Sequence, residues 1–259
     1  MRKKLWTTDL LIKLSPTAKA NTYTMNPTLY CNCFRGYENR MTQFDQRNLM
    51  CGADSFDFAY RADLTSRGFV FDDHGDHISN LNQFLGDLTG LYWVWKNTTD
   101  AVVGTNQYRR MWDNDEINKL VFDPDTIYVL SRVSFDESAY DQYVRHHGQY
   151  GMDLLFTAVD KNKIDLPHVA DLKTVNYLHC NNMFIAGREV FDRICQRLFD
   201  IVLALYKGIA HLLPGAPSNQ TRTIAFLAER ILTVMFVNPE YYFGKVKIQE
   251  VGWSFDPRK

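Results

Sequence analysis

The sequence lacks a long uninterrupted run of apolar residues. Its longest apolar stretch, within 201–213, is broken by Lys207 and His211, whereas a helix that spans a membrane needs about 20 mostly apolar residues in a row. Residues 1–14 combine a basic start with a weak apolar stretch but offer no small-residue cleavage site, so we do not interpret them as a signal peptide. We expect residues 1–24 to be an N-terminal extension of a cytoplasmic protein without a transmembrane segment.

The sequence also lacks an excess of either charge and any cysteine spacing typical of a zinc site. Its 29 basic and 30 acidic residues give a net charge of -1, so no overall basic surface is present to attract nucleic acid. The five cysteines are an odd number, and Cys31 and Cys33 are only two positions apart, which fits no common zinc pattern. We therefore expect reduced thiols, as is usual in the cytoplasm.

Several catalytic motifs are missing as well. The chain contains no Gly-x-Ser-x-Gly, no Walker loop, no dinucleotide-binding glycine fingerprint, no His-Glu-x-x-His and no Cys-x-x-Cys. These absences disfavour a serine hydrolase, a P-loop kinase, a dinucleotide-dependent oxidoreductase and a zinc protease.

Short apolar strands alternate with amphipathic helices along residues 25–259, which we interpret as one domain. We expect strands at 28–34, 68–72, 101–105, 126–130 and 182–186, with an edge strand or hairpin at 244–255. We expect helices at 41–51, 83–96 with Asn82 as N-cap, 137–160, 188–212 and 221–237. The alternation predicts a single-domain α/β fold with a mostly parallel sheet flanked by helices.

Ligands of such sheets bind beyond the carboxyl ends of the strands. We therefore expect residues 72–76, residues 105–110 and the loop after Ala186 to surround one cleft. Asn181 and Asn182 lie at the start of the buried strand predicted at 182–186 and are candidates to hydrogen-bond sugar hydroxyls; a purely structural turn is the alternative.

An acidic loop follows the second predicted strand. Asp72, Asp73 and Asp76 surround a glycine, with His74 and His77 between them. Carboxylates and imidazoles of this kind are ligands for Mg²⁺ or Mn²⁺. The alternative is a solvated turn whose aspartates accept hydrogen bonds from backbone amides.

Two adjacent arginines follow Tyr108 at the end of the third predicted strand. Guanidinium groups pair with phosphate oxygens, so Arg109 and Arg110 are candidates to bind a diphosphate. Because neighbouring residues of an extended strand point to opposite sides, we expect only one of them to face the cleft. The alternative is a surface pair bridged to Asp113 and Asp115.

Asp113 and Asp115 also form an Asp-x-Asp pattern, which many nucleotide-sugar transferases use to hold Mn²⁺. An exposed acidic turn is the alternative. Arg222 and Glu229 are seven positions apart on the last predicted helix and so share one face. Glu229 is a candidate general base, with an ordinary ion pair to Arg230 as the alternative.

Four segments of the chain resemble the domain of unknown function 4422 family, whose members are similar to glycosyltransferases and often accompany capsule and O-antigen synthesis. The segments are FDDHGDHISNLNQFLGDLTGLYWVWKN (71–97), VVGTNQYRRMW (102–112), LHCNNMFIAGREVFDRICQRLFDIV (178–202) and RTIAFLAERILTVMF (222–236). The chain departs from the family pattern at Gln107, where histidine is usual, at Asp87, where glutamate is usual, and at His77, where asparagine is usual.

The resemblance implies a GT-A-like fold, Rossmann-like in binding nucleotides, and a hexosyltransferase of polysaccharide biosynthesis that uses a UDP-sugar donor and a glycan acceptor. From the charge balance we expect no nucleic-acid partner, and from the acidic residues Mn²⁺ or Mg²⁺ is a candidate cofactor. The candidate donor-binding residues are Phe34, Arg35, Asp72, Asp73, Tyr108, Arg109, Arg110, Asn181 and Asn182. The candidate catalytic residues are Asp87, Glu229 and Asp153, and the candidate metal ligands are Asp113 and Asp115.

Two other functions remain open at this point. A non-catalytic carbohydrate-binding protein on a transferase-like scaffold would explain Gln107 in place of the family histidine. A nucleotidyltransferase that makes sugar nucleotides would need a glycine-rich phosphate loop after the first strand, and residues 35–39 (RGYEN) match such a loop poorly.

Overall fold

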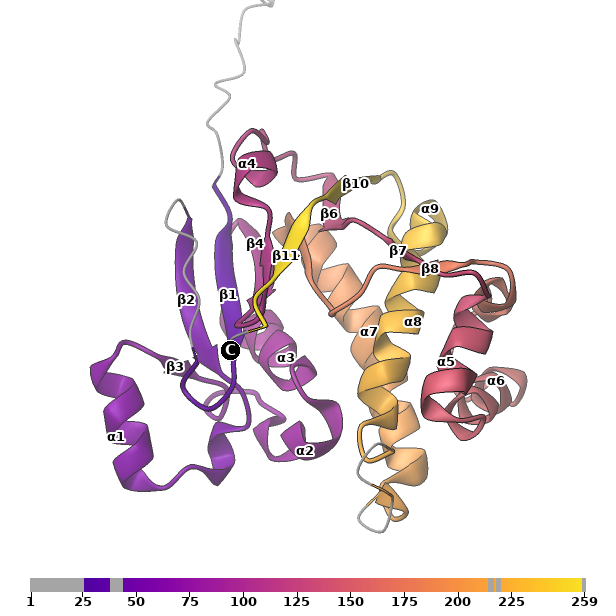
Figure 1. Cartoon of the computed structure of the whole chain (residues 1–259), viewed down its shortest axis with the longest axis horizontal. Coiled ribbons are helices and arrows are strands. Elements are labelled where there is room, and N and C mark those ends of the chain that lie inside the picture. Colours follow the sequence, from indigo (N-terminus) through magenta and orange to yellow (C-terminus); the bar gives the residue numbers. More distant parts are fainter. Residues whose placement is uncertain (1–25, 38–43, 214–216, 218–219, 258–259) are drawn as a thin grey trace, which may run out of the picture.

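The computed structural model describes residues 26–37, 44–213, 217 and 220–257. Its centre is a seven-stranded mixed sheet with the strand order β10-β6-β9-β4-β1-β2-β3 (Figure 1). These strands are β1 (Thr28–Cys33), β2 (Asp45–Met50), β3 (Val70–Phe71), β4 (Val102–Gln107), β6 (Thr126–Leu130), β9 (Phe184–Gly187) and β10 (Lys247–Val251). All neighbours pair in parallel except β9, which runs antiparallel to both β4 and β6. The predicted α/β fold with a mostly parallel sheet is confirmed.

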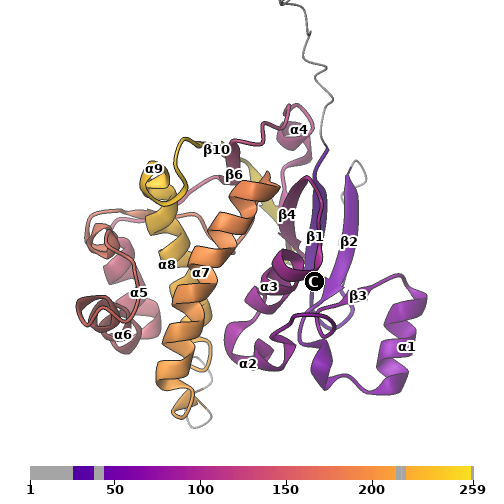
Figure 2. The same cartoon turned by 180° about the vertical axis from the view of Figure 1, so that it is seen from behind.

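Helices cover the sheet and extend beyond it, as the two opposite views show (Figures 1 and 2). They are α1 (Phe58–Ser66), α2 (Asn82–Leu85), α3 (Leu88–Asn97), α4 (Asn114–Ile117), α5 (Ala139–His147), α6 (Tyr150–Asp160), α7 (Arg188–Ile209), α8 (Thr223–Val237) and α9 (Pro239–Phe243). Short 3-10 turns are η1 (Ala53–Ser55), η2 (Ser79–Leu81) and η3 (Val169–Lys173), and two small antiparallel pairs join β5 (Arg110–Trp112) to β11 (Trp253–Phe255) and β7 (Val133–Ser134) to β8 (Tyr177–Leu178). None of the helices in the described ranges is long and apolar enough to cross a membrane.

Side chains of the central strands alternate between separate apolar clusters. Tyr30 and Val103 belong to the largest cluster, which contains α3, α7 and α8. Leu29 and Val102 point to the other face, against Trp112. This period-two alternation is the expected consequence of strand geometry, and both faces of the central strands are therefore buried.

The expected helix at 41–51 is wrong, because residues 45–50 form β2. This strand pairs in parallel with β1 over its whole length, from Asp45 opposite Thr28 to Met50 opposite Cys33. Tertiary pairing has outweighed the local sequence preference. The expected N-terminal extension, residues 1–24, lies outside the described residues.

Two expected long helices are each divided by a glycine. Gly86 has φ 57° and separates α2 from α3, and Gly148 has φ 79° and separates α5 from α6. Glycine adopts such positive φ values without steric cost. The break at Gly86 places Asp87 at the N-cap of α3, and it makes Asn82 the first residue of α2 rather than the N-cap of one continuous helix.

The direction of β9 decides which loops lie at the carboxyl ends of the parallel strands. Because β9 is antiparallel to β4, with Gly104 opposite Ile185, the residues before β9 lie beside the carboxyl end of β4. The loop after Ala186 lies beside the amino end of β4, at the other end of the strands. The prediction that this loop borders the cleft is therefore wrong. The C-terminal strands also form no hairpin with each other, since β10 joins the edge of the main sheet and β11 pairs with β5.

The acidic loop after β3 is bound to its surroundings by hydrogen bonds. The carboxylate of Asp72 is fully buried and accepts hydrogen bonds from the amides of Gly52 and Ala53 and from the hydroxyl of Ser79. Asp73 forms an ion pair with Arg61.

Replacing Asp72 with alanine should lower the free energy of unfolding by about 2–4 kcal/mol, because two amides and a hydroxyl would lose their shared acceptor. Urea denaturation followed by tryptophan fluorescence measures the change. The control is Asp54→Ala, an exposed carboxylate in the neighbouring turn, which should cost no more than about 0.5 kcal/mol. Equal stability of the two variants would contradict the structural role of Asp72.

Candidate functional site

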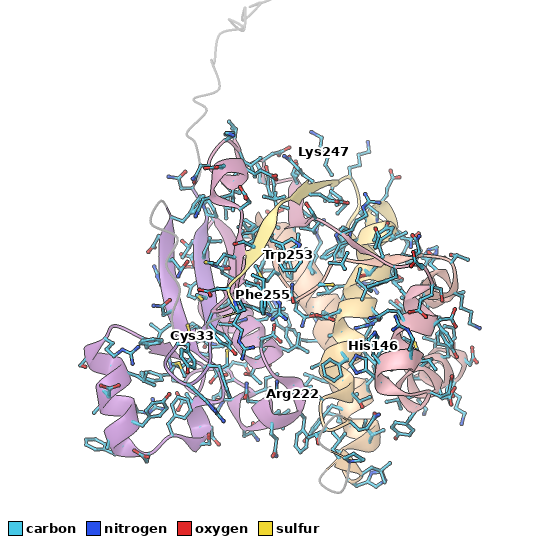
Figure 3. All side chains as sticks on the ribbon, in the orientation of Figure 1. Cys33, His146, Arg222, Lys247, Trp253 and Phe255 are labelled. Atoms are coloured by element: carbon cyan, nitrogen blue, oxygen red, sulfur yellow. The ribbon has the colours of Figure 1, made fainter. Side chains whose placement is uncertain are left out.

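A cavity of about 410 Å³ lies at the carboxyl ends of β1 and β4. One side is formed by the strand ends and the turn after β4, the other by one face of α8, and Asp87 lies between them. Figure 3 shows Cys33 on the strand side and Arg222 beside the lower end of α8. The lining residues are Asn32, Cys33, Phe34, Cys51, Asn82, Gly86, Asp87, Gln107, Tyr108, Arg109, Arg110, Asn181, Asn182, Arg222, Ala225, Phe226 and Glu229.

Asp87 is held in place by amide groups from three segments. Its Oδ2 accepts a hydrogen bond of 2.7 Å from Gln107 Nε2, and its Oδ1 lies 3.5 Å from Asn182 Nδ2. Its backbone carbonyl accepts from Asn32 Nδ2 at 3.3 Å. Gln107 therefore serves as a neutral donor to Asp87, a role that its amide fulfils without taking up a proton.

The surroundings of Asp87 raise the pKa of its carboxyl group from 3.8 to about 6. Burial is the main cause, because it disfavours the charged form, and the negative charge of Glu229 adds to it. The hydrogen bonds from Gln107 and Asn182 act in the opposite direction. Asp87 thus changes its charge close to neutral pH.

Glu229 is engaged on both carboxylate oxygens. Oε1 accepts from the amide of Asn181 at 2.7 Å, and Oε2 accepts from Arg230 Nη1 at 3.1 Å. Arg230 is only 2% exposed and also donates to the carbonyl of Phe226 and to Gln142. Glu229 therefore lines the cavity in a fixed position, with its negative charge neutralised by Arg230.

Asn181 and Asn182 both adopt left-handed backbone conformations, with φ 71° and 51°. Asparagine tolerates this region better than most residues. Asn181 Nδ2 and Asn182 Oδ1 are buried, and neither has a hydrogen-bond partner within the described residues. Since buried polar atoms are normally paired, these two atoms are available to a ligand in the cavity.

Both arginines after β4 line the cavity, so the expectation that only one would face it is wrong. The strand ends at Gln107 and the chain bends at Tyr108 and Arg109 before β5 begins, which removes the strict alternation of an extended strand. Arg110 Nη1 donates to Gln107 Oε1 at 3.2 Å. Arg109 lies 5.1 Å from the centre of the Tyr108 ring, and its Nε is buried without a partner among the described residues.

Aromatic rings lie next to these arginines. Tyr108 stacks on Tyr37 with ring centres 6.0 Å apart and contacts Phe34 at 6.3 Å. Phe34 and Tyr37 are 41% and 47% exposed. Exposed rings of this kind offer a flat surface for a nucleobase.

Several candidate residues lie elsewhere. Asp72 and Asp73 belong to the anchored loop described above, and Arg35 contacts the Phe34 ring without lining the cavity. Asp153 lies on α6 and accepts from Gln149. Asp113 caps α4 by accepting from the amides of Asp115 and Glu116. Helix α4 lies near the end of the sheet where β1 begins (Figure 1), and neither Asp113 nor Asp115 lines the cavity.

The described residues offer no ready-made set of three protein ligands for a divalent cation at this cavity. Across the described ranges no three His, Cys, Asp or Glu side chains come close enough together to hold a metal ion. The two carboxylates of the cavity, Asp87 and Glu229, already accept hydrogen bonds from Gln107, Asn181 and Arg230. Positive charge is supplied to the cavity by the guanidinium groups of the lining arginines.

Sequence reasoning missed several lining residues, among them Asn32 and Cys51. Asn32 is buried in β1 and its Oδ1 lies 3.6 Å from Cys51 Sγ. A Cβ on Gly90 would lie 2.4 Å from that same Oδ1, so a glycine is required where α3 approaches β1. An asparagine within an otherwise apolar strand was the available signal.

The chain matches the family model described as domain of unknown function (DUF4422) over residues 58–240. The chain belongs to the DUF4422 family. Its structure is similar to the apo structure of WbbM, described as a bifunctional glycosyltransferase, with a TM-score of 0.70 and 21% sequence identity. The match covers 90% of this chain and 45% of WbbM, so this DUF4422 chain corresponds to less than half of that protein. No curated protein matches the chain.

The similarity to WbbM establishes a glycosyltransferase-like fold for this DUF4422 protein. In this chain, the antiparallel β9 and the glycine break before α3 bring Gln107, Asn181 and Asp87 together.

Replacing Asp87 with asparagine should stabilise the protein at high pH. The folded state keeps the proton up to about pH 6, whereas the unfolded chain loses it near 3.8. Between these values the folded state binds more protons, so the free energy of unfolding falls as pH rises from about 4 to 6. The destabilisation that results from ionising the buried Asp87 is fully present above pH 6. The free energy of unfolding of Asp87→Asn should therefore exceed that of the unmodified protein by about 2 kcal/mol at pH 8, after allowance for solvent in the cavity. Near pH 4 the two proteins should be equally stable.

Urea denaturation at both pH values measures this difference. Asp153→Asn is the control, because Asp153 lies outside the cavity and its replacement should have the same small effect at both pH values. An Asp87→Asn variant that is less stable than the unmodified protein at pH 8 would contradict the raised pKa.

Proposed function

We propose that this protein is a glycosyltransferase that transfers a hexose from a nucleoside diphosphate sugar, a UDP-sugar, to a glycan acceptor. The observation that carries the proposal is the position of Asp87, a carboxylate with a raised pKa, between the arginines after β4 and the unpaired amide atoms of Asn181 and Asn182. A perturbed carboxylate among groups suited to phosphate and sugar is typical of a catalytic site.

The donor would lie with its nucleotide at the strand ends. Its base would stack beside Phe34 and Tyr108, and its diphosphate would pair with Arg109 and Arg110. The unpaired atoms of Asn181 and Asn182 would bind hydroxyls of the donor sugar. Each group would thus meet a ligand atom of complementary charge or hydrogen-bonding type.

Transfer then requires a base and a stabilised leaving group. The acceptor hydroxyl oxygen forms a bond to C1 of the donor sugar while the bond from C1 to the β-phosphate oxygen breaks. Asp87 takes the hydroxyl proton, and the nucleoside diphosphate leaves with both electrons of the broken bond. Arg109 and Arg110 stabilise the charge that develops on it. Glu229 is less suited to be the base, because its carboxylate forms an ion pair with the buried Arg230, whereas Asp87 accepts only from neutral amides.

Alanine at Arg109 or Arg110 should weaken UDP binding by at least tenfold and leave uridine binding nearly unchanged, because only UDP carries the phosphates. Isothermal titration with UDP and uridine measures both affinities, with Mn²⁺ and with EDTA. UDP should bind in both conditions, since Arg109 and Arg110 supply positive charge for its phosphates. Failure of the unmodified protein to bind UDP in either condition would reject the proposal.

Transfer should depend on Asp87 and on pH. Because the base must be unprotonated, kcat/KM should fall tenfold per pH unit below about pH 6, the pKa of Asp87. Asp87→Asn should lower kcat by about 100-fold or more while UDP binding persists. UDP release from a panel of UDP-sugars with glycan acceptors measures both effects.

Asp153→Asn, the off-cavity control, should retain full activity. If glycans bind but no UDP-sugar is consumed by the unmodified protein under any of these conditions, the chain is a carbohydrate-binding protein on a transferase-like scaffold instead.

A further inference from the structure

Arg222 lines the cavity on the side opposite the arginines after β4. It lies at the N-cap of α8, and Ala225, Phe226 and Glu229 follow it along the same face of the helix. A Cβ added to Gly86 would lie 3.9 Å from Arg222 Nη1, so the guanidinium approaches the backbone directly before Asp87. Figure 3 shows Arg222 beside the lower end of α8.

Arg222 is exposed to solvent as well as lining the cavity. The guanidinium of Arg222 makes no hydrogen bond or ion pair within the described part of the chain. The N-terminal end of a helix carries a partial positive charge, so an arginine there is electrostatically unfavourable. An arginine that lines a cavity and has no partner among the described residues is free to pair with an anionic ligand.

The charges of the cavity favour anionic ligands at both of its ends. Three arginines line it, against two carboxylates, and one of these carboxylates, Glu229, is balanced by Arg230 behind it. Gly86 and Asp87 lie between the two groups of arginines: Gln107 connects Asp87 to Arg110, and Gly86 adjoins Arg222. One reacting centre is thus flanked by two separate cationic sites.

We propose that Arg222 binds an anionic group of the acceptor, a phosphate or a carboxylate, while Arg109 and Arg110 bind the donor. This inference rests on the proposed function, because it assigns the strand side of the cavity to the nucleotide. The acceptor of this enzyme is then an acidic or phosphorylated glycan rather than a neutral one.

The test uses the full chain saturated with UDP, so that the donor side is occupied. Three probes are titrated and followed by NMR: glycerol 1-phosphate for a phosphorylated acceptor, glucuronate for an acidic sugar, and glycerol as the neutral reference. The unmodified protein should bind at least one anion and not glycerol. Arg222→Gln should weaken that binding at least tenfold and keep UDP affinity within twofold.

Arg193→Gln is the matched control, since Arg193 is an exposed arginine on α7 outside this cavity, and it should bind the anion as the unmodified protein does. Binding of glycerol 1-phosphate would indicate a phosphorylated acceptor, and binding of glucuronate would indicate an acceptor with an acidic sugar. The inference is overturned if the UDP complex binds neither anion, if Arg222→Gln binds them equally well, or if Arg222→Gln loses UDP, which would assign Arg222 to the donor. If the unmodified protein does not bind UDP, the proposed function fails together with this inference. If it binds UDP but neither anion, only this inference fails, so the two failures are distinguishable.

Discussion

β9 runs antiparallel between β4 and β6, and the position of the functional groups depends on that pairing. It carries Asn181 and Asn182 to the carboxyl end of β4, where Gln107 donates both to Asp87 Oδ2 and to the carbonyl of Asn181. A parallel β9 would have sent these asparagines to the opposite edge of the sheet. One strand direction therefore brings together segments that are more than seventy positions apart in the sequence.

The electrostatic balance of the cavity follows from the same arrangement. Asp87 is enclosed and close to Glu229, which raises its pKa to about 6. Glu229 itself is held by the buried Arg230 and by the amide of Asn181. The carboxyl group of Asp87, at the centre of the cavity, thus has a pKa close to neutral pH. The positive charges of Arg109 and Arg110 lie on one side of it and that of Arg222 on the other.

Much of the architecture was predictable from apolar periodicity. The strands near 28–34 and 126–130 and the long helix near 188–212 were located within a few residues, because burial on regular elements leaves a regular pattern. The helix expected at 41–51 failed because β2 is stabilised by its neighbour β1 rather than by its own sequence. Of the candidate site, Asp87, Arg109, Arg110, Asn181, Asn182 and Glu229 all line the cavity, whereas Asp72, Asp113 and Asp153 do not. Carboxylates that cap turns and helices have the same local sequence signature as carboxylates that bind ligands.

The sequence by itself determined the α/β class, the order of most elements and the family, because these depend on local patterns and on motifs that are contiguous in the chain. Only the tertiary structure decided that both arginines face the cavity, that Gln107 orients Asp87, and that Arg222 lies across from them without a partner among the described residues. These facts depend on a chain bend, on one strand direction and on a glycine break. Each sets the relative position of distant segments, and that position is fixed by long-range pairing and packing.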